Sequence, residues 1–315
     1  MEAQLRALIA QHGVFTRGEA RALGYHDHAI AMLVKSGEWV RVRRGAYVLG
    51  TAWAALDEGE RYGVLCRAAV HQARADVVLS HLSAANEHGV PLWDCDLTTV
   101  HLTRTDRRAG RAEAGVVQHR GLIADGDVVV HGGLAVMSPT RAALELTTML
   151  DVEHALVGMD FLLHHRLTTM EHLRARYETM DCWPDTLTTD LVLRLSDGRS
   201  ESVGETRARF LCWSQHLPAP IPNYVIRDHR GAEIARVDLA WPTLGVFLEF
   251  DGRAKYERHR RDGESVTDCV LREKKRESRI CEITGWRCIR IVWSDLSRPV
   301  EVAARIRRLF QPISA

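Results

Sequence analysis

The sequence predicts a mixed α+β fold that is divided among several domains. Its 315 residues exceed the roughly 100–200 residues of a typical domain, so two or three domains are expected. The first part reads as short helices followed by a hairpin, and the last part as helix, three strands, helix, strand and helix. Apolar residues make up 46% of the chain, which is enough to fill several cores.

The overall charge favours neither nucleic acid nor membrane as a partner. Lys and Arg total 42 against 41 Asp and Glu, a net charge of +1, so an argument for nucleic-acid binding has to be local. No apolar run approaches the roughly 20 residues that span a bilayer, and the N-terminus lacks an apolar signal core. Seven scattered cysteines without C-x-x-C spacing indicate reduced thiols. We therefore expect a cytoplasmic protein without a membrane partner.

Residues 1–52 contain the signals of three short helices and a hairpin. Leu5, Leu8 and Ile9 mark the apolar face of the first helix. Thr16 and Glu19 have the spacing of a capping box, which predicts the start of a second helix. Residues 26–35 then read as a third helix. The stretch WVRVRRGAYVL alternates like a two-stranded hairpin that turns at Arg44-Gly45.

Three short helices followed by a basic hairpin is the element order of a winged helix-turn-helix. In that fold the third helix enters the major groove and the wing contacts backbone phosphates, so double-stranded DNA is the predicted partner. Two other interpretations remain open. The segment could be a small helical domain with a solvated hairpin, or a protein-interaction module. The predicted DNA-contacting residues of this part are Arg17, Lys35, Arg41, Arg43 and Arg44.

The segments GVFTRGEARALGY and W-x-R-V-R-R-G-x-Y resemble the N-terminal domain of AbiEi-type antitoxins. The likeness continues through a middle domain at residues 53–182, in VVLSHLSAANEHGVP and in MSPTRAALELTTML. In the second of these Ser138 is a helix cap and Pro139 takes the first helical position. His81 and Ser83 are best interpreted as capping or core hydrogen-bonding residues. The resemblance implies a cognate toxin as a further partner, and residues 183–203 are the expected linker.

Residues 204–315 place three carboxylates among apolar strand residues. With a period of two, Val246, Leu248 and Phe250 face one side of a strand, while Glu249 and Asp251 project together from the other. Asp238 lies near the end of the neighbouring antiparallel strand and can approach that pair. Clustered carboxylates repel each other unless a cation lies among them, and oxygen ligands suit Mg²⁺ or Mn²⁺. The predicted metal ligands are Asp238, Glu249 and Asp251.

A carboxylate-bound metal beside basic residues suits phosphodiester hydrolysis. The metal polarises a phosphoryl oxygen and lowers the pKa of a bound water, while a lysine stabilises the charge of the transition state. Lys255 follows the strand closely and is the predicted catalytic lysine. Lys274 and Lys275, on the long helix expected within residues 264–284, are predicted to contact DNA, although a solvated helix face explains this run equally well.

This part resembles the PD-(D/E)XK, or restriction-endonuclease-like, nucleases, and within them the very-short-patch-repair-like branch. The matching residues are Glu205, Asp238 in V-D-L-A-W-P, Glu249 and Asp251 in L-E-F-D-G, and Lys255. The resemblance implies an α/β nuclease domain in which these five residues are catalytic. It departs from the common motif, because Asp251 stands where the lysine usually does. Lys255 would replace that lysine from a shifted position, and Lys274 or Lys275 on the long helix is a second candidate.

Together these patterns predict a DNA-binding protein with a metal-dependent endonuclease domain, in a phage-defence, toxin–antitoxin or DNA-repair context. The main alternative is a non-catalytic antitoxin or transcriptional autorepressor whose nuclease-like domain is degenerate. A structural adaptor that contacts a toxin through the middle domain is a third reading.

Overall fold

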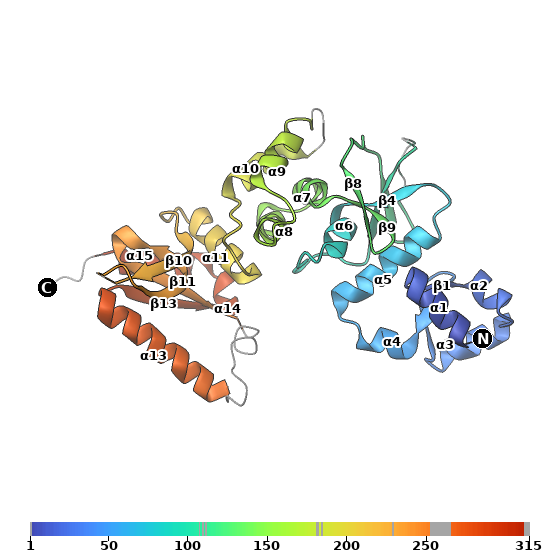
Figure 1. Ribbon diagram of the computed structural model, residues 1–315, viewed down its shortest axis with the longest axis horizontal. Helices are drawn as coiled ribbons and strands as arrows, with labels where there is room; N and C mark the ends of the chain where they lie inside the picture. Colours follow the sequence, from blue (N-terminus) through green and yellow to red (C-terminus); the bar gives the residue numbers. More distant parts are fainter. Residues whose placement is uncertain are drawn as a thin grey trace. The chain divides into compact units, whose positions relative to one another are not determined.

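The computed structural model describes residues 2–252, except 107, 109, 111, 181, 182, 184 and 229, and residues 266–311 (Figure 1). These residues form a multidomain α+β structure with three sheets. It divides into two compact units. Unit 1 comprises Met1–Gly158 and Leu167–Leu193, and unit 2 comprises Met159–Arg166 and Arg194–Ala315.

The N-terminal elements have the order and the sheet of a winged helix. Their bounds are α1 (Glu2–His12), β1 (Phe15–Thr16), α2 (Arg17–Ala22), α3 (Asp27–Lys35), β2 (Trp39–Arg43) and β3 (Ala46–Leu49). The three strands form a sheet in the order β1-β3-β2. The capping box predicted from the sequence is present, since the Thr16 side chain accepts from the Glu19 backbone and Glu19 caps Thr16 in return. The prediction of three helices and a hairpin is confirmed.

The wing sheet packs on both of its faces. Phe15, Trp39 and Tyr47 join residues of α1, α2 and α3 in one core. The opposite face carries Val40 and Val42, which pack against a second small core. That core includes residues of α5 (Glu58–His71), which follows α4 (Gly50–Ala55). Both faces are covered, so the hairpin is held rigidly against its domain.

The middle part of unit 1 is a six-stranded mixed sheet with the order β6-β7-β5-β4-β9-β8. The strands are β4 (Val77–Leu79), β5 (Val100–Arg104), β6 (Ala112–Glu113), β7 (Val116–His119), β8 (Val128–His131) and β9 (Leu134–Met137). The helices of this region are α6 (His81–Glu87), α7 (Pro139–Thr147), α8 (Val152–His164) and α9 (Met170–Tyr177). As predicted, Ser138 caps α7 and its side chain accepts from the Arg141 backbone.

The segment predicted as a linker contains regular structure. Residues 183–203 include η1 (Thr186–Thr188) and α10 (Thr189–Leu195). Val192 and Leu193 of α10 are buried, so this stretch contributes apolar packing. The Ser, Gly and Asp residues at its C-terminal end had suggested a linker without such packing. Helix α8 also runs from unit 1 into unit 2, where its buried Asp160 accepts from Thr206.

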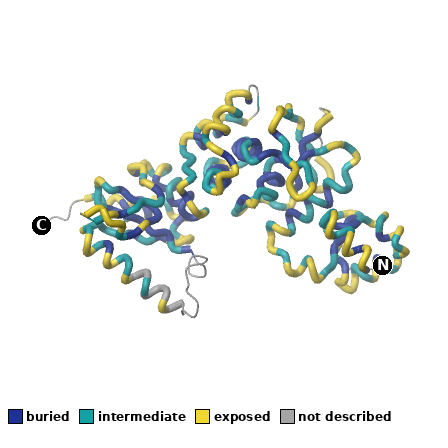
Figure 2. The backbone as a smooth tube through the Cα atoms, in the orientation of Figure 1, coloured by how far each residue is buried: buried dark blue, intermediate teal, exposed yellow. Residues whose placement is uncertain are grey.

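Unit 2 has the helix, three strands, helix, strand and helix predicted from the sequence. Its elements are α11 (Val203–Ser214), β10 (Ile221–Arg227), β11 (Glu233–Trp241), η2 (Pro242–Leu244), β12 (Val246–Asp251), α13 (Val266–Thr284), β13 (Arg287–Val292), α14 (Trp293–Leu296) and α15 (Pro299–Phe310). The sheet order is β10-β11-β12-β13, with β12 and β13 parallel and the other pairs antiparallel. Figure 2 shows its strands as the buried centre of the unit.

The predicted period of β12 is confirmed by its two cores. Leu248 and Phe250 pack with residues of α11 and α15 on one side of the sheet. Phe247 packs with Ile280 of α13 on the other side. Glu249 and Asp251 therefore project towards the α13 side, as the alternation of a strand requires.

Close packing of α11 on β12 depends on Gly204. A Cβ at this position would lie 2.0 Å from Cε1 and 2.4 Å from Cδ1 of Phe250. We expect Gly204→Ala to lower the free energy of unfolding of unit 2 by about 1–3 kcal/mol, the usual cost of overpacking. Chemical denaturation followed by Trp fluorescence measures it. Gly18→Ala is the matched control, because its nearest atom would lie 3.8 Å away; equal stability of the two variants would contradict the expectation.

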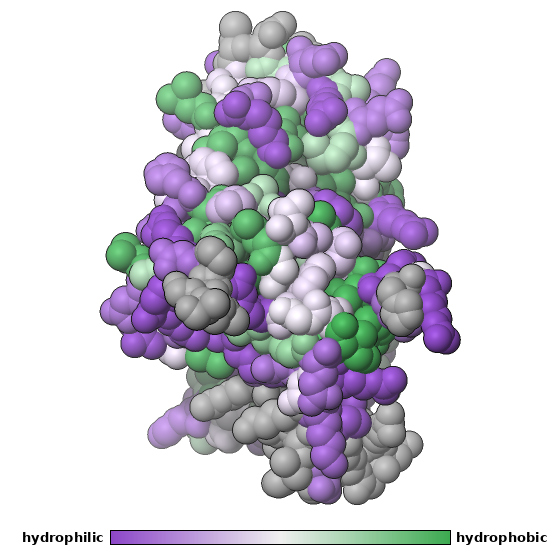
Figure 3. All heavy atoms as spheres, turned by 90° about the vertical axis from the view of Figure 1, so that its left-hand side faces the viewer, coloured by the Kyte–Doolittle hydropathy of each residue, from purple (hydrophilic) through white to green (hydrophobic). Residues whose placement is uncertain are grey.

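The surface mixes side chains of both kinds. In the face shown in Figure 3, hydrophobic side chains form small areas between hydrophilic ones. No helix in the described part of the chain is long and apolar enough to cross a bilayer.

Candidate functional site

The wing presents arginines to solvent at its tip. Arg41 and Arg44 are exposed, whereas Arg43 is half-buried, and burial lowers the pKa of Arg43. The ladder between β2 and β3 shifts register between Arg41 and Arg43, so the strand bulges there. Gly45 completes the turn with a φ of +77°, a conformation that glycine adopts readily. This arrangement aims two cations outward from a rigid hairpin.

Helix α3 is held by one face and exposed on the other. Ile30 is buried in the core, with Leu33 and Val34 packed beside it. Met32 is 51% exposed, and Lys35 at the end of the helix is exposed as well. A helix with this exposure, placed just before the wing, is what reading a DNA groove requires.

Arg17, which was also predicted to contact DNA, is engaged in an ion pair. Its Nε and Nη2 donate to the two carboxylate oxygens of Asp27 at 2.9 and 2.6 Å. The pair links the first residue of α2 to the first residue of α3 and is about half exposed. The pair connects the two helices at the surface, and Asp27 offsets the charge that Arg17 could offer a phosphate.

In unit 2, Asp238 turns towards the backbone of the neighbouring strand. Its Oδ2 accepts from the Phe250 backbone N–H at 2.7 Å, just beyond the last ladder pair of β11 and β12, Leu239 with Leu248. The residue is 8% exposed. A carboxylate therefore continues the β-ladder where main-chain pairing ends.

Glu205 lies on the first turn of α11, where the charge of Asp238 affects its protonation. Its carboxylate accepts from Ser202 Oγ at 2.9 Å and from Asn223 Nδ2 at 2.8 Å. Burial, and after it the negative charge of Asp238, raise the pKa of Glu205 despite these hydrogen bonds. Both acids are buried, and the charge of Asp238 acts on Glu205, while their joint role at a metal site stays a prediction.

Glu249 and Asp251 are bound to arginines. Glu249 accepts from Arg276 of α13 at 2.7 Å, and Asp251 accepts from Arg290 of β13 at 2.8 and 2.9 Å. Arg290 also pairs with Glu277 of α13. Within the described ranges, these acids do not form a group of three carboxylates with ligand atoms within 4.8 Å of one another. The predicted Mg²⁺ or Mn²⁺ site stays a prediction, and it requires arginine ion pairs to open.

Of the three lysines predicted to act at or near this site, the structure describes the side chain of one. Lys255 lies outside the described residues, as does the side chain of Lys274. Lys275 is exposed on α13. Among the described residues, the guanidinium groups of Arg276 and Arg290 pair with Glu249 and Asp251 respectively.

A buried charged network in unit 1 was missed by sequence reasoning. Arg141 is 2% exposed, and its guanidinium donates to Glu145 at 2.9 Å, to Asp127 at 2.8 Å and to the Leu122 carbonyl at 3.1 Å. Its guanidinium also stacks 3.9 Å from the ring centroid of Trp183. The i, i+4 spacing of Arg141 and Glu145 within an otherwise apolar helix was the available signal.

Three histidines border this network. His101 Nδ1 and His119 Nε2 are 2.9 Å apart, and the His81 ring stacks on His119 at 3.8 Å. Burial lowers the pKa of His81 to about 3 and those of His101 and His119 to about 4, so all three are neutral at pH 7. Ser83 accepts from the His101 backbone and bonds the Tyr62 hydroxyl, which confirms its predicted core role.

Comparison with known proteins finds a family match for the N-terminal part of the chain. Residues 3–50 match the family described as "Transcriptional regulator, AbiEi antitoxin". Two uncharacterized proteins of Mycobacterium tuberculosis, from strains CDC 1551 / Oshkosh and H37Rv, are each 31% identical over 180 residues, which is 57% of this chain. The match spans 62% of the length of those relatives. Residues 3–50 therefore form an AbiEi-antitoxin-family domain.

Proposed function

We propose that the chain is a DNA-binding transcriptional regulator of the antitoxin type, which contacts DNA through α3 and the wing. The observation that carries this proposal is the exposed pair Arg41 and Arg44 on a rigid hairpin, within the segment that matches the AbiEi family. Arginines at a wing bind phosphates, and the exposed face of α3 suits groove readout. The family also suggests a cognate toxin as partner, for which the middle part of unit 1 is the proposed contact region.

The test is a binding titration with labelled duplexes from upstream of the chain's own gene and with duplexes of scrambled sequence. Specific regulators bind their sites at least about 10³-fold more tightly than other DNA. We expect such a ratio, together with an affinity that falls steeply with salt. Equal and weak affinity for all duplexes would contradict the proposal.

A second candidate function is metal-dependent phosphodiester hydrolysis by unit 2. The observation that favours it is the buried pair Glu205 and Asp238, whose repulsion a divalent cation would relieve. The element order of unit 2 agrees with the nuclease resemblance. Asp238, Glu249 and Asp251 would hold the ion and Glu205 would assist, provided that Arg276 and Arg290 move away from Glu249 and Asp251.

Removing the Asp238 carboxylate tests this second function. If the chain nicks supercoiled plasmid in Mg²⁺, Asp238→Asn should slow nicking by more than about 100-fold, the upper range for loss of a residue that merely orients a metal ligand. Glu282→Gln, an exposed acid on α13, is the control and should nick at the wild-type rate. Absence of nicking by the wild type in Mg²⁺ and Mn²⁺ would contradict the nuclease function, and the regulator would remain as the proposed function.

A further inference from the structure

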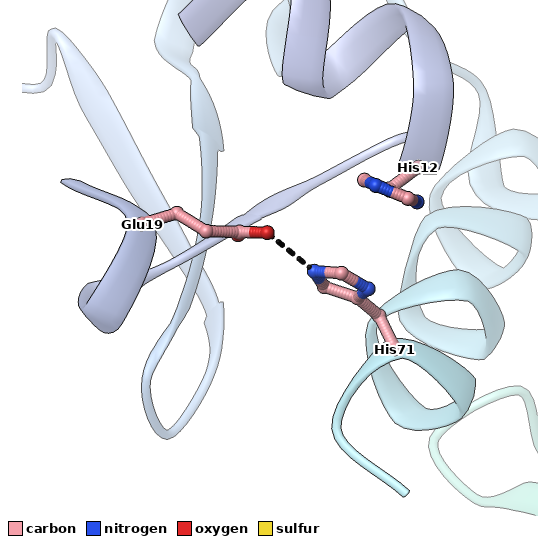
Figure 4. A group of neighbouring side chains, drawn as sticks. All are labelled: His12, Glu19 and His71. Atoms are coloured by element: carbon pink, nitrogen blue, oxygen red, sulfur yellow. Dashed lines mark hydrogen bonds and ion pairs between the residues drawn. The ribbon is translucent and has the colours of Figure 1, made fainter. Parts of the chain in front are cut away.

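His12, Glu19 and His71 come together from three elements of unit 1 (Figure 4). His12 is the last residue of α1, Glu19 lies in α2, and His71 is the last residue of α5. His71 Nε2 is 2.9 Å from Glu19 Oε1, and the two imidazole rings stack with centroids 4.3 Å apart. One ligand atom of each residue lies within 4.8 Å of those of the other two.

The carboxylate in this cluster is held in place by the helix cap. Glu19 Oε2 accepts from the backbone N–H and the hydroxyl of Thr16 at 2.6 and 2.9 Å. Oε1 is thereby directed at His71. The two histidines are fixed by the ends of helices that both belong to unit 1. The cluster is half-buried, so its ligand atoms remain reachable from solvent.

We propose that His12, Glu19 and His71 bind a divalent transition-metal ion, with zinc as the best fit. Two imidazoles and one carboxylate, with a fourth position for water, are a ligand set that zinc uses in proteins. Ligand atoms at about 2.0–2.2 Å around a tetrahedral ion lie roughly 3.4 Å apart. His71 Nε2 and Glu19 Oε1 are 2.9 Å apart, and no ligand atom of the cluster lies more than 4.8 Å from another, so side-chain rotations can bring the three ligands to this spacing.

The position of this site gives it a consequence for DNA binding, which rests on the proposed function. The ion would join α1 and α2 of the winged helix to the end of α5, which lies outside it. Because α2 and α3 share one core through Ala20 and Ile30, fixing α2 also restrains the helix proposed to read DNA. Metal would then stabilise one arrangement of the winged helix and increase its affinity for its site.

Metal binding is tested on the full chain, reduced and freed of metal by chelator. We expect one equivalent of Co²⁺ or Zn²⁺ to bind, and His12→Gln and His71→Gln each to weaken it by more than about 100-fold, because each removes a direct ligand. His172→Gln, an exposed histidine on α9, is the control and should bind as the wild type does. Undiminished binding in both cluster variants, or no binding by the wild type at micromolar concentrations, overturns the site.

A second measurement on the wild type does not depend on the stability of the variants. X-ray absorption of the zinc-loaded chain should show nitrogen and oxygen neighbours with imidazole scattering, and a sulfur shell would overturn the site. DNA titrations with and without Zn²⁺ read the consequence separately, and equal affinities would refute the metal response. Failure of the chain to bind DNA under either condition counts against the proposed function and leaves the metal titration unaffected.

Discussion

Arg41→Glu combined with Arg44→Glu is expected to abolish specific DNA binding while the fold persists. Both side chains are exposed at the wing, so their replacement removes no core contact. Each reversal replaces an attraction to phosphate with a repulsion. We expect the affinity for the target duplex to fall by more than about 100-fold at physiological salt, given that phosphate contacts supply a large share of binding energy.

Neutral substitutions resolve how many phosphates are contacted. Arg41→Gln and Arg44→Gln should each reduce the slope of log K against log salt concentration by about 0.9, the value for one phosphate contact on B-DNA. Fluorescence anisotropy between low and moderate salt measures the slope. Arg174→Glu, an exposed arginine of α9 in the same unit, is the matched control for charge. A wild-type slope in both wing variants would show that the wing does not touch the backbone.

Local features of this fold were predictable, because they depend on neighbours in the sequence. The Thr16–Glu19 capping box needs only a spacing of three residues, and it is present as predicted. The two faces of β12 follow from a period of two, and Leu248 and Phe247 do lie in different cores. Both features are determined by backbone geometry that a short segment carries in itself.

The partners of the charged residues were not predictable in the same way. Glu249 pairs with Arg276, which is 27 residues later, and Asp251 pairs with Arg290, which is 39 residues later. Several arginines of this region have a similar spacing from the acids. The packing of α13 on the sheet selects Arg276, and the pairing of β13 with β12 selects Arg290. Glu249 and Asp251, whose spacing predicted metal ligands, are thus salt-bridge partners in the structure. Spacing alone does not distinguish a metal ligand from a salt-bridge partner.

The same limit applies to His12, Glu19 and His71. Glu19 was recognised for its cap, but His71 lies 52 residues further along the chain. No motif joins residues at such separations, since their meeting depends on how α5 packs against the winged helix. Function that arises from packing between elements leaves little trace in a single sequence.

The largest effect on stability is expected from Arg141→Met in α7. Arg141 is buried between two carboxylates, and Asp127 has a second partner in Arg176 at 2.7 Å. Among the described residues, Glu145, which is 1% exposed, would keep the hydrogen bond from the His81 backbone N–H and the nearby His81 ring, neither of which carries the charge of Arg141. Breaking a buried pair by removing one partner costs about 3–5 kcal/mol. Thermal and urea unfolding should show this loss, while Arg174→Met on the exposed face of α9 should leave stability nearly unchanged.

The cause of that loss can be separated from lost packing by a second substitution. If the penalty comes from an unpaired Glu145 carboxylate, then Arg141→Met with Glu145→Gln should recover much of the stability, because position 145 no longer carries a buried charge and Asp127 keeps its pair with Arg176. A double variant that is the sum of two losses would instead show that the guanidinium acts through its packing on Trp183.

The pH dependence of the stability of Arg141→Met is an independent test of whether the loss comes from charge. Burial already raises the pKa of Glu145 in the folded protein, and Arg141 opposes that rise. Without Arg141 the folded-state pKa rises further above its unfolded value, so the folded state binds the proton more tightly. The penalty relative to the wild type is then complete above the folded pKa of the variant and disappears as pH falls towards the lower folded pKa of the wild type, which is itself raised. The stability difference between Arg141→Met and the wild type should therefore shrink on acidification, and a difference that stays constant from neutral pH to about pH 4.5, near the ordinary glutamate pKa, would place its origin in packing rather than in charge.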